Sequence, residues 1–151
     1  MVDEVTVHVD APAEAIYALV TDVRSMGRWS PECTGARWLG GAAGPAVGAR
    51  FVGFNRHGLA HWFTRCEVTA AEPGHHFEFQ VKESGMVWGY RFVPSPDGAS
   101  TDVTEYRTEV RRPGVVVRAV QRSGLIGRDR DTKMVDGMHA TLERVKAAAE
   151  A

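Results

Sequence analysis

The feature that most constrains the fold is a series of short stretches, rich in β-branched and aromatic residues, between residues 36 and 110. Segments containing Gly, Pro or Asp separate them at the spacing of an antiparallel meander. Near the N-terminus, Val5, Val7 and Val9 alternate with polar residues, which is typical of a strand with one buried face. Together the stretches predict a sheet of six or seven strands. We place these strands at Val5–Val9, Ala36–Leu39, Arg50–Asn55, Ala60–Ala70, His76–Glu83, Val87–Val93 and Thr101–Val110.

Helical patterns flank the strands on both sides. Asp10 is the predicted N-cap of a helix that ends near Asp22, and a second short helix is predicted over Val23–Trp29. From Asp129 onward, apolar residues at spacings of three and four predict a long terminal helix. Its apolar stripe consists of Met134, Val135, Met138, Leu142 and Val145. This order predicts a single α+β domain, residues 1–151, in which a curved antiparallel sheet wraps around the terminal helix.

Composition limits the possible partners. With 18 Lys and Arg against 19 Asp and Glu, the net charge of -1 provides no general field that would attract nucleic acid or an anionic membrane. The sequence shows neither a secretory leader nor an apolar run long enough for stable membrane insertion, so we expect a cytoplasmic protein. Cys33 and Cys66 form no CxxC pair, and the six histidines have no common metal spacing. We therefore expect reduced thiols, no metal and no cofactor.

Several local sequences resemble one known family. They are the opening VTVHVDAPAEAIYALVTDVRSMGRWSPE, the stretch VGARFVGFNRHG, HWFTRCEV with the following AAEPGHHFEFQV, and WGYRFVP leading to TDVTEYRTEV. They resemble the polyketide cyclase/dehydrase branch of the START-like (Bet v 1-like, SRPBCC) superfamily. The resemblance implies a helix-grip fold with a cavity between the sheet and the terminal helix. Members of this superfamily range from ring-closing or dehydrating enzymes to carriers and sensors of hydrophobic molecules.

Reading each strand with a period of two gives a candidate ligand-binding wall. Its residues are Phe51, Asn55, Trp62, Thr64, Phe79, Trp88 and Tyr90 from the strands, with Met134 and Met138 from the helix. From composition alone, such aromatic and methionine stripes are typical of a solid core, whereas the resemblance implies a cavity. Trp29 either rims the entrance of that cavity or packs the second helix onto the sheet.

Two polar residues of this wall are candidates for chemistry. Asn55 needs a hydrogen-bond partner if it faces inward, and either a ligand oxygen or the backbone near His57 and Gly58 would serve. Tyr90 is a candidate acid or hydrogen-bond donor toward a ligand carbonyl.

Glu105 is the third candidate, and its role depends on the register of the last strand. One register points Val103, Glu105 and Arg107 inward, and the other points Thr104, Tyr106 and Thr108 inward. An inward Glu105 would be paired or have a raised pKa, which suits a general base beside a carbonyl. An outward Glu105 would be a solvated surface charge.

Three functions follow from these observations. The first is binding of a small hydrophobic ligand such as a lipid, polyketide or aromatic metabolite. The second is a polyketide aromatase/cyclase or dehydratase that uses the same cavity. The third is a toxin or stress-response protein that acts through a protein partner. The sequence is equally compatible with a monomer and a homodimer.

Overall fold

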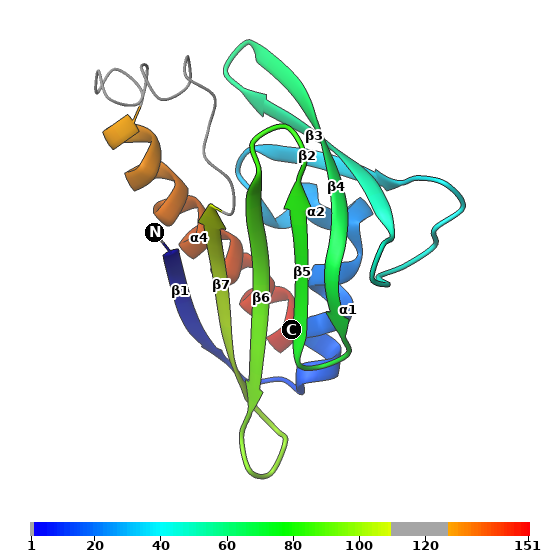
Figure 1. Cartoon of the computed structure of the whole chain (residues 1–151). Coiled ribbons are helices and arrows are strands. Elements are labelled where there is room, and N and C mark those ends of the chain that lie inside the picture. The colour runs from blue at the N-terminus through cyan, green and yellow to red at the C-terminus, as the bar shows by residue number, and fades with distance from the viewer. Residues whose placement is uncertain (1, 110–126) are drawn as a thin grey trace.

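A seven-stranded antiparallel sheet dominates the computed structural model, which describes residues 2–109 and 127–151 but not the side chains of residues 2, 109 and 127–134. The strand order is β1-β7-β6-β5-β4-β3-β2 (Figure 1). The strands are β1 Val2–Val9, β2 Cys33–Trp38, β3 Arg50–His57, β4 Ala60–Glu72, β5 His76–Val81, β6 Met86–Pro94 and β7 Thr101–Glu109. The predicted curved antiparallel sheet is confirmed.

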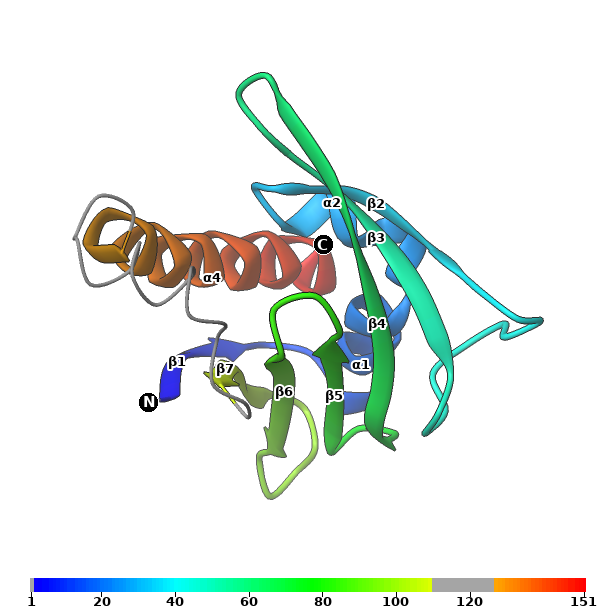
Figure 2. The ribbon, with the colours of Figure 1, turned by 45° about the horizontal axis from the view of Figure 1, so that its top comes forward.

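The helices lie on the concave side of the sheet (Figure 2). Two short helices follow β1, namely α1 Ala13–Thr21 and, after a 3-10 turn at Val23–Ser25, α2 Met26–Trp29. The terminal helix α4, Gly127–Glu150, packs mainly on β1 and also contacts α1, α2 and β7. The predicted α+β helix-grip architecture is therefore confirmed. Within the described ranges, no helix is both long and apolar enough to cross a membrane.

The predicted N-cap at Asp10 is wrong. Helix α1 begins at Ala13, and Pro12 precedes it in an extended conformation without a side-chain cap. The reason is local, because a proline disfavours helical geometry in the residue before it and so delays the first turn. Asp10 instead uses its backbone N–H, which donates to Glu150 Oε2 at 2.8 Å. This bond joins the end of β1 to the end of α4.

The strand pairing settles the register of β7. Glu105 lies opposite Tyr90 of β6 and opposite Val5 of β1. Val103 and Arg107 share its face and are buried with it, so this is the inner face, toward the helices. Thr104 and Tyr106 lie on the outer face.

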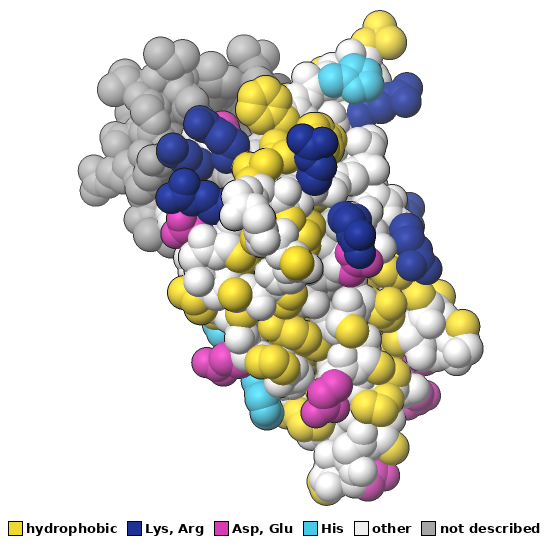
Figure 3. Space-filling view, turned by 90° about the vertical axis from the view of Figure 1, so that its right-hand side faces the viewer, with side chains coloured by type: hydrophobic (Ala, Val, Ile, Leu, Met, Phe, Trp, Pro, Cys, Tyr) yellow, Lys and Arg dark blue, Asp and Glu magenta, His cyan; other side chains and the backbone are white. Residues whose placement is uncertain are grey.

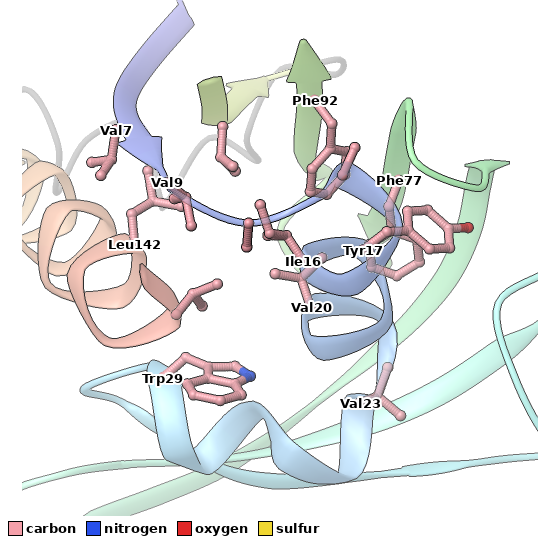
Figure 4. Close-up of a cluster of buried hydrophobic side chains, with 14 of the residues drawn as sticks. Val7, Val9, Ile16, Tyr17, Val20, Val23, Trp29, Phe77, Phe92 and Leu142 are labelled. Carbon is pink, nitrogen blue, oxygen red and sulfur yellow. The ribbon is translucent and has the colours of Figure 1, made fainter. Parts of the chain in front are cut away.

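The core lies between α1, α4 and the inner face (Figure 4). The Tyr17 ring packs edge-on against Phe77 and Phe92, with centroid distances of 6.4 and 5.8 Å. Trp29 is 5% exposed in the same cluster, and Arg144 of α4 donates to its carbonyl at 3.1 Å. Trp29 therefore packs its helix into the core, which is one of the two roles considered for it.

Candidate functional site

The inner face has a solid part and a more accessible part. Near α1, Phe77 and Phe92 are almost fully buried. Phe51 is also buried, at 1% exposure, and packs edge-on against Trp38 and Phe79 at centroid distances of 5.5 and 5.1 Å. The other predicted wall residues on the strands are only half-buried. They are Asn55, Trp62, Thr64, Phe79, Trp88 and Tyr90.

The strand registers place these half-buried residues in pairs on neighbouring strands, with the pair from β3 and β4 toward the hairpin tip, beyond the end of β5. Asn55 pairs with Trp62, Phe79 with Trp88, and Tyr90 with Glu105. From the helix, Met138 is buried at 2% exposure, whereas the side chain of Met134 lies outside the described residues. The predicted common face is therefore present, and its role as a ligand wall stays a prediction.

Glu105 and Tyr90 face each other across the β6–β7 pair in the middle of this face. Burial raises the pKa of Glu105 to about 8, although the hydrogen bond from Tyr90 opposes that rise. Burial, reinforced by the neighbouring Glu105 carboxyl, also holds the pKa of Tyr90 well above its usual value. At neutral pH both groups are therefore mainly protonated, and both can donate a hydrogen bond.

One oxygen of this pair lacks a partner. Among the described residues, Glu105 Oε2 is buried and accepts or donates no hydrogen bond. Tyr17 Oη and Trp29 Nε1 share this property, but they belong to the helices packed in the core (Figure 4). Of these three atoms, Glu105 Oε2 is the one that comes from a strand, and it lies on the inner face of the sheet.

Arg107 adds a positive charge to the same face. Its Nε donates to Asp3 Oδ2 at 2.7 Å, and the side chain of Arg107 is only 9% exposed. Asp3 was missed in the sequence analysis, although the alternation that includes Val5 and Val7 would have placed it on this face. The ion pair compensates the buried guanidinium and fixes the edge of the site next to β1.

Asn55 has a partner that neither of its two predicted alternatives named. Its side-chain amide donates to Thr64 Oγ1 at 3.3 Å across the β3–β4 pair. No backbone bond to the turn near His57 and Gly58 involves its side chain in the described residues. The Asn55 carbonyl oxygen stays available on the half-buried surface.

The two cysteines are free thiols. Burial raises the pKa of Cys66 to about 12 and also raises the pKa of Cys33. Because the thiolate is the nucleophilic form, neither residue is suited to nucleophilic catalysis. Within residues 2–109 and the described side chains of α4, no group of three or more His, Cys, Asp or Glu could hold a metal ion.

A second polar cluster, on the outer face, was not predicted. Tyr106 hydrogen-bonds to Glu78 and to Nε2 of His76, the latter at 2.7 Å, and Arg91 stacks over its ring. Tyr106 is only 5% exposed because its ring lies directly over Gly89, where any Cβ atom would collide with it. The pairing of a strand glycine with an aromatic residue on the next strand is the sequence signal that could have revealed this arrangement.

Comparisons with known proteins agree with this fold. A family model described as "Polyketide cyclase / dehydrase and lipid transport" matches residues 4–150. No curated protein matches the sequence. A polyketide-cyclase-like protein from Corynebacterium glutamicum is 29% identical, with a TM-score of 0.62 over 99% of this chain and 88% of its own.

Two further similar structures are di-domain ARO/CYC proteins. BexL, from the BE-7585A biosynthetic pathway, is 18% identical with a TM-score of 0.69, over 96% of this chain and 46% of its own. StfQ, from the steffimycin biosynthetic pathway, is 16% identical with a TM-score of 0.67, over 98% of this chain and 44% of its own. At these identities the likeness concerns the fold.

Proposed function

We propose that this chain, which belongs to the polyketide cyclase/dehydrase and lipid transport family, acts as one domain that binds a small hydrophobic molecule between the inner face of the sheet and α4. The ligand is a lipid, polyketide or aromatic metabolite that carries at least one carbonyl or hydroxyl oxygen. The observation that carries this proposal is the buried, unpartnered Oε2 of Glu105 on a face lined by half-buried aromatic rings.

The energetics support a ligand with an oxygen atom. An unsatisfied buried polar group costs about 1–3 kcal/mol, and a ligand oxygen placed against protonated Glu105 would remove that cost. Trp88 follows Tyr90 on the same face of β6, and Phe79 pairs with Trp88, so these two rings offer apolar contact area beside Glu105. A few convergent polar groups within a mainly apolar lining are typical of small-molecule sites.

Fluorescence titration tests this proposal, because Trp62 and Trp88 belong to the wall. The probes are a hydroxyanthraquinone and a long-chain fatty acid, and native mass spectrometry of the purified protein identifies any molecule that co-purifies. We expect Glu105→Leu to weaken binding of the anthraquinone about tenfold. Tyr106→Phe is the matched control, since it alters a buried tyrosine on the opposite face, and it should leave the affinity unchanged. The proposal fails if neither probe binds and nothing co-purifies.

A second candidate function, polyketide cyclase or dehydratase, is favoured by one specific observation. Burial raises the pKa of Glu105 to about 8, and Glu105 faces Tyr90 across the β6–β7 pair. Its ionised form could remove a proton from a carbon between two carbonyls, and the resulting enolate would attack a second carbonyl of the same chain. Glu105 would return the proton to the new alkoxide, and loss of water would complete the aromatic ring. Tyr90 would donate a hydrogen bond to the developing enolate oxygen.

Incubation with a linear poly-β-ketone separates binding from catalysis. Glu105→Gln preserves the shape of the side chain but cannot accept a proton. If the protein is a cyclase, this variant binds the probe with unchanged affinity and loses product formation by about a hundredfold or more. If wild type forms no aromatic product above the uncatalysed rate, the protein is a binding protein only.

A further inference from the structure

The charges of this protein are divided unevenly along the chain. All 19 Asp and Glu residues lie outside residues 33–66, a segment that contains Arg37, Arg50, Arg56 and Arg65. The segment forms β2, β3 and the first half of β4, at the edge of the sheet opposite β1. Two of these arginines are paired with carboxylates across the sheet, Arg50 with Glu67 at 3.2 Å and Arg65 with Glu83 at 2.8 Å. Arg37 and Arg56 therefore account for the positive charge of this edge.

Part of this edge projects from the molecule. The β3–β4 hairpin extends past the neighbouring strands (Figures 1 and 2). Its turn holds Gly58 in the left-handed region, with φ of +61°, and Arg56 Nε donates to the Gly58 carbonyl at 3.2 Å. Leu59, at the tip, is 97% exposed. The apolar side chain of Leu59 is thus fully exposed to solvent next to the hydrogen-bonded guanidinium of Arg56.

The outer face of the hairpin continues this arrangement. Phe54 and Phe63 pair directly across the two strands and are 44% and 59% exposed. Arg37 and Arg65 occupy the next pairs of the same face, on either side of Val52. Figure 3 shows Lys and Arg side chains around exposed hydrophobic ones at the upper, hairpin end, whereas most acidic side chains lie in the lower half. We call this area the hairpin surface. It consists of Phe54, Arg56, Leu59, His61 and Phe63.

We propose that the hairpin surface docks the protein reversibly on an anionic lipid bilayer. Leu59 and the two phenylalanines would enter the boundary between headgroups and acyl chains, and Arg56 would contact lipid phosphates. Three exposed apolar side chains beside Arg56, on a segment with no carboxylate of its own, are complementary to such a surface. A stable protein interface buries about 800 Å² on each partner, which is more than three exposed apolar side chains on a narrow hairpin provide. Docking on a bilayer needs less buried area, because attraction between Arg56 and the lipid phosphates adds to the free energy of binding.

Docking here would bring the bilayer next to the hairpin end of the proposed ligand wall, and this step rests on the proposed function. Asn55, Trp62 and Thr64 belong to the same hairpin but point to the inner face. A hydrophobic ligand that leaves the bilayer along the hairpin would therefore meet the predicted wall without crossing open water. The docking itself does not require that a ligand binds.

Vesicle flotation with the purified full chain tests the docking. One vesicle population contains phosphatidylcholine alone, and the other contains about 30 mol % phosphatidylglycerol. We expect binding to the anionic vesicles only, and loss of that binding at high salt. Leu59→Ser should weaken it about tenfold, and Arg56→Gln about fivefold. Arg56→Lys should restore the affinity.

Two matched variants provide the controls. Val93→Ser removes another exposed apolar side chain, 63% exposed, at the far end of β6, and Arg24→Gln removes an exposed arginine on the 3-10 turn. Neither should change vesicle binding. Absence of binding to anionic vesicles overturns the proposal and would favour an acidic protein as the partner of the hairpin surface. Equal losses for Leu59→Ser and Val93→Ser also overturn it.

A titration with the anthraquinone probe, without vesicles, keeps the two proposals separate. Leu59→Ser should bind this probe as wild type does, because Leu59 is 97% exposed at the hairpin tip and does not line the inner face. Failure of ligand binding would leave the flotation result unaffected, and failure of flotation would leave the titration unaffected.

Discussion

Glu105 is the residue in which burial and chemistry are most closely linked. The pKa of a glutamate in the unfolded chain is near 4.5, and burial raises it to about 8 in the folded protein. The folded state therefore binds more protons than the unfolded state between these two values. The stabilising contribution of this proton is complete below pH 4.5 and is lost as the pH rises through about 8.

We expect Glu105→Gln to remove this pH dependence. From about pH 5 to about pH 8, the free energy of unfolding of wild type should fall relative to the variant by about 1 kcal/mol per pH unit. Urea denaturation of both proteins across this range measures the difference. His8 also has a raised pKa, because it hydrogen-bonds to Asp102, but it is present in both proteins and cancels. A constant difference between the two curves would show that Glu105 titrates normally.

At the scale of elements, the sequence predicted the strands well because turn residues separate them clearly. It could not predict the inward face of β7, since both faces of this strand carry polar residues. Glu105 and Arg107 lie on one side and Thr104 and Tyr106 on the other. Only pairing with Val5 and Val7 of β1 and with Tyr90 and Phe92 of β6 distinguishes the two registers.

The candidate site was likewise predictable from the sequence only in part. The alternation of β3, β4, β5 and β6 predicted the shared face correctly, because each of these strands has one predominantly apolar side. The hydrogen-bond and packing partners of single side chains depend on distances between strands, which the alternation of apolar and polar residues does not specify. Asn55 bonds to Thr64, and Tyr106 is buried on the solvent face of the sheet by Gly89 and Arg91. Such contacts join strands whose register must be known first.

The apolar stripe of α4 has two parts, and each predicts a different effect of mutation. Leu142 and Val145 belong to the core cluster, whereas Met138 is buried but stands outside it. We expect Leu142→Ala to cost about 2–5 kcal/mol of stability without changing ligand affinity. Met138→Ala should change the affinity for the anthraquinone probe by about threefold or more, because the proposed cavity lies beneath it. Chemical denaturation and fluorescence titration of both variants measure the two quantities. Unchanged affinity in Met138→Ala would remove this residue from the wall.

For the whole molecule, the proposed site couples ligand binding, protonation and global stability. A ligand that binds only the folded state raises the melting temperature by mass action. If the ligand oxygen accepts a hydrogen bond from the protonated Glu105, its affinity stays constant below about pH 8. Above that pH the carboxyl is ionised and cannot donate, so the affinity falls by up to about tenfold per pH unit.

The ligand-induced rise in melting temperature should therefore shrink above about pH 8. We expect this for a neutral carbonyl or hydroxyl ligand, measured by calorimetric titration and thermal melting across the same pH range. Glu105→Gln should bind with an affinity that does not vary with pH, since its amide donates at every pH. If wild type and Glu105→Gln lose affinity in parallel, another group controls the dependence, and Glu105 does not hold the ligand. If only wild type loses affinity, the unpartnered oxygen on the inner face is the ligand's anchor, and one proton determines both how tightly the protein binds and how stably it folds.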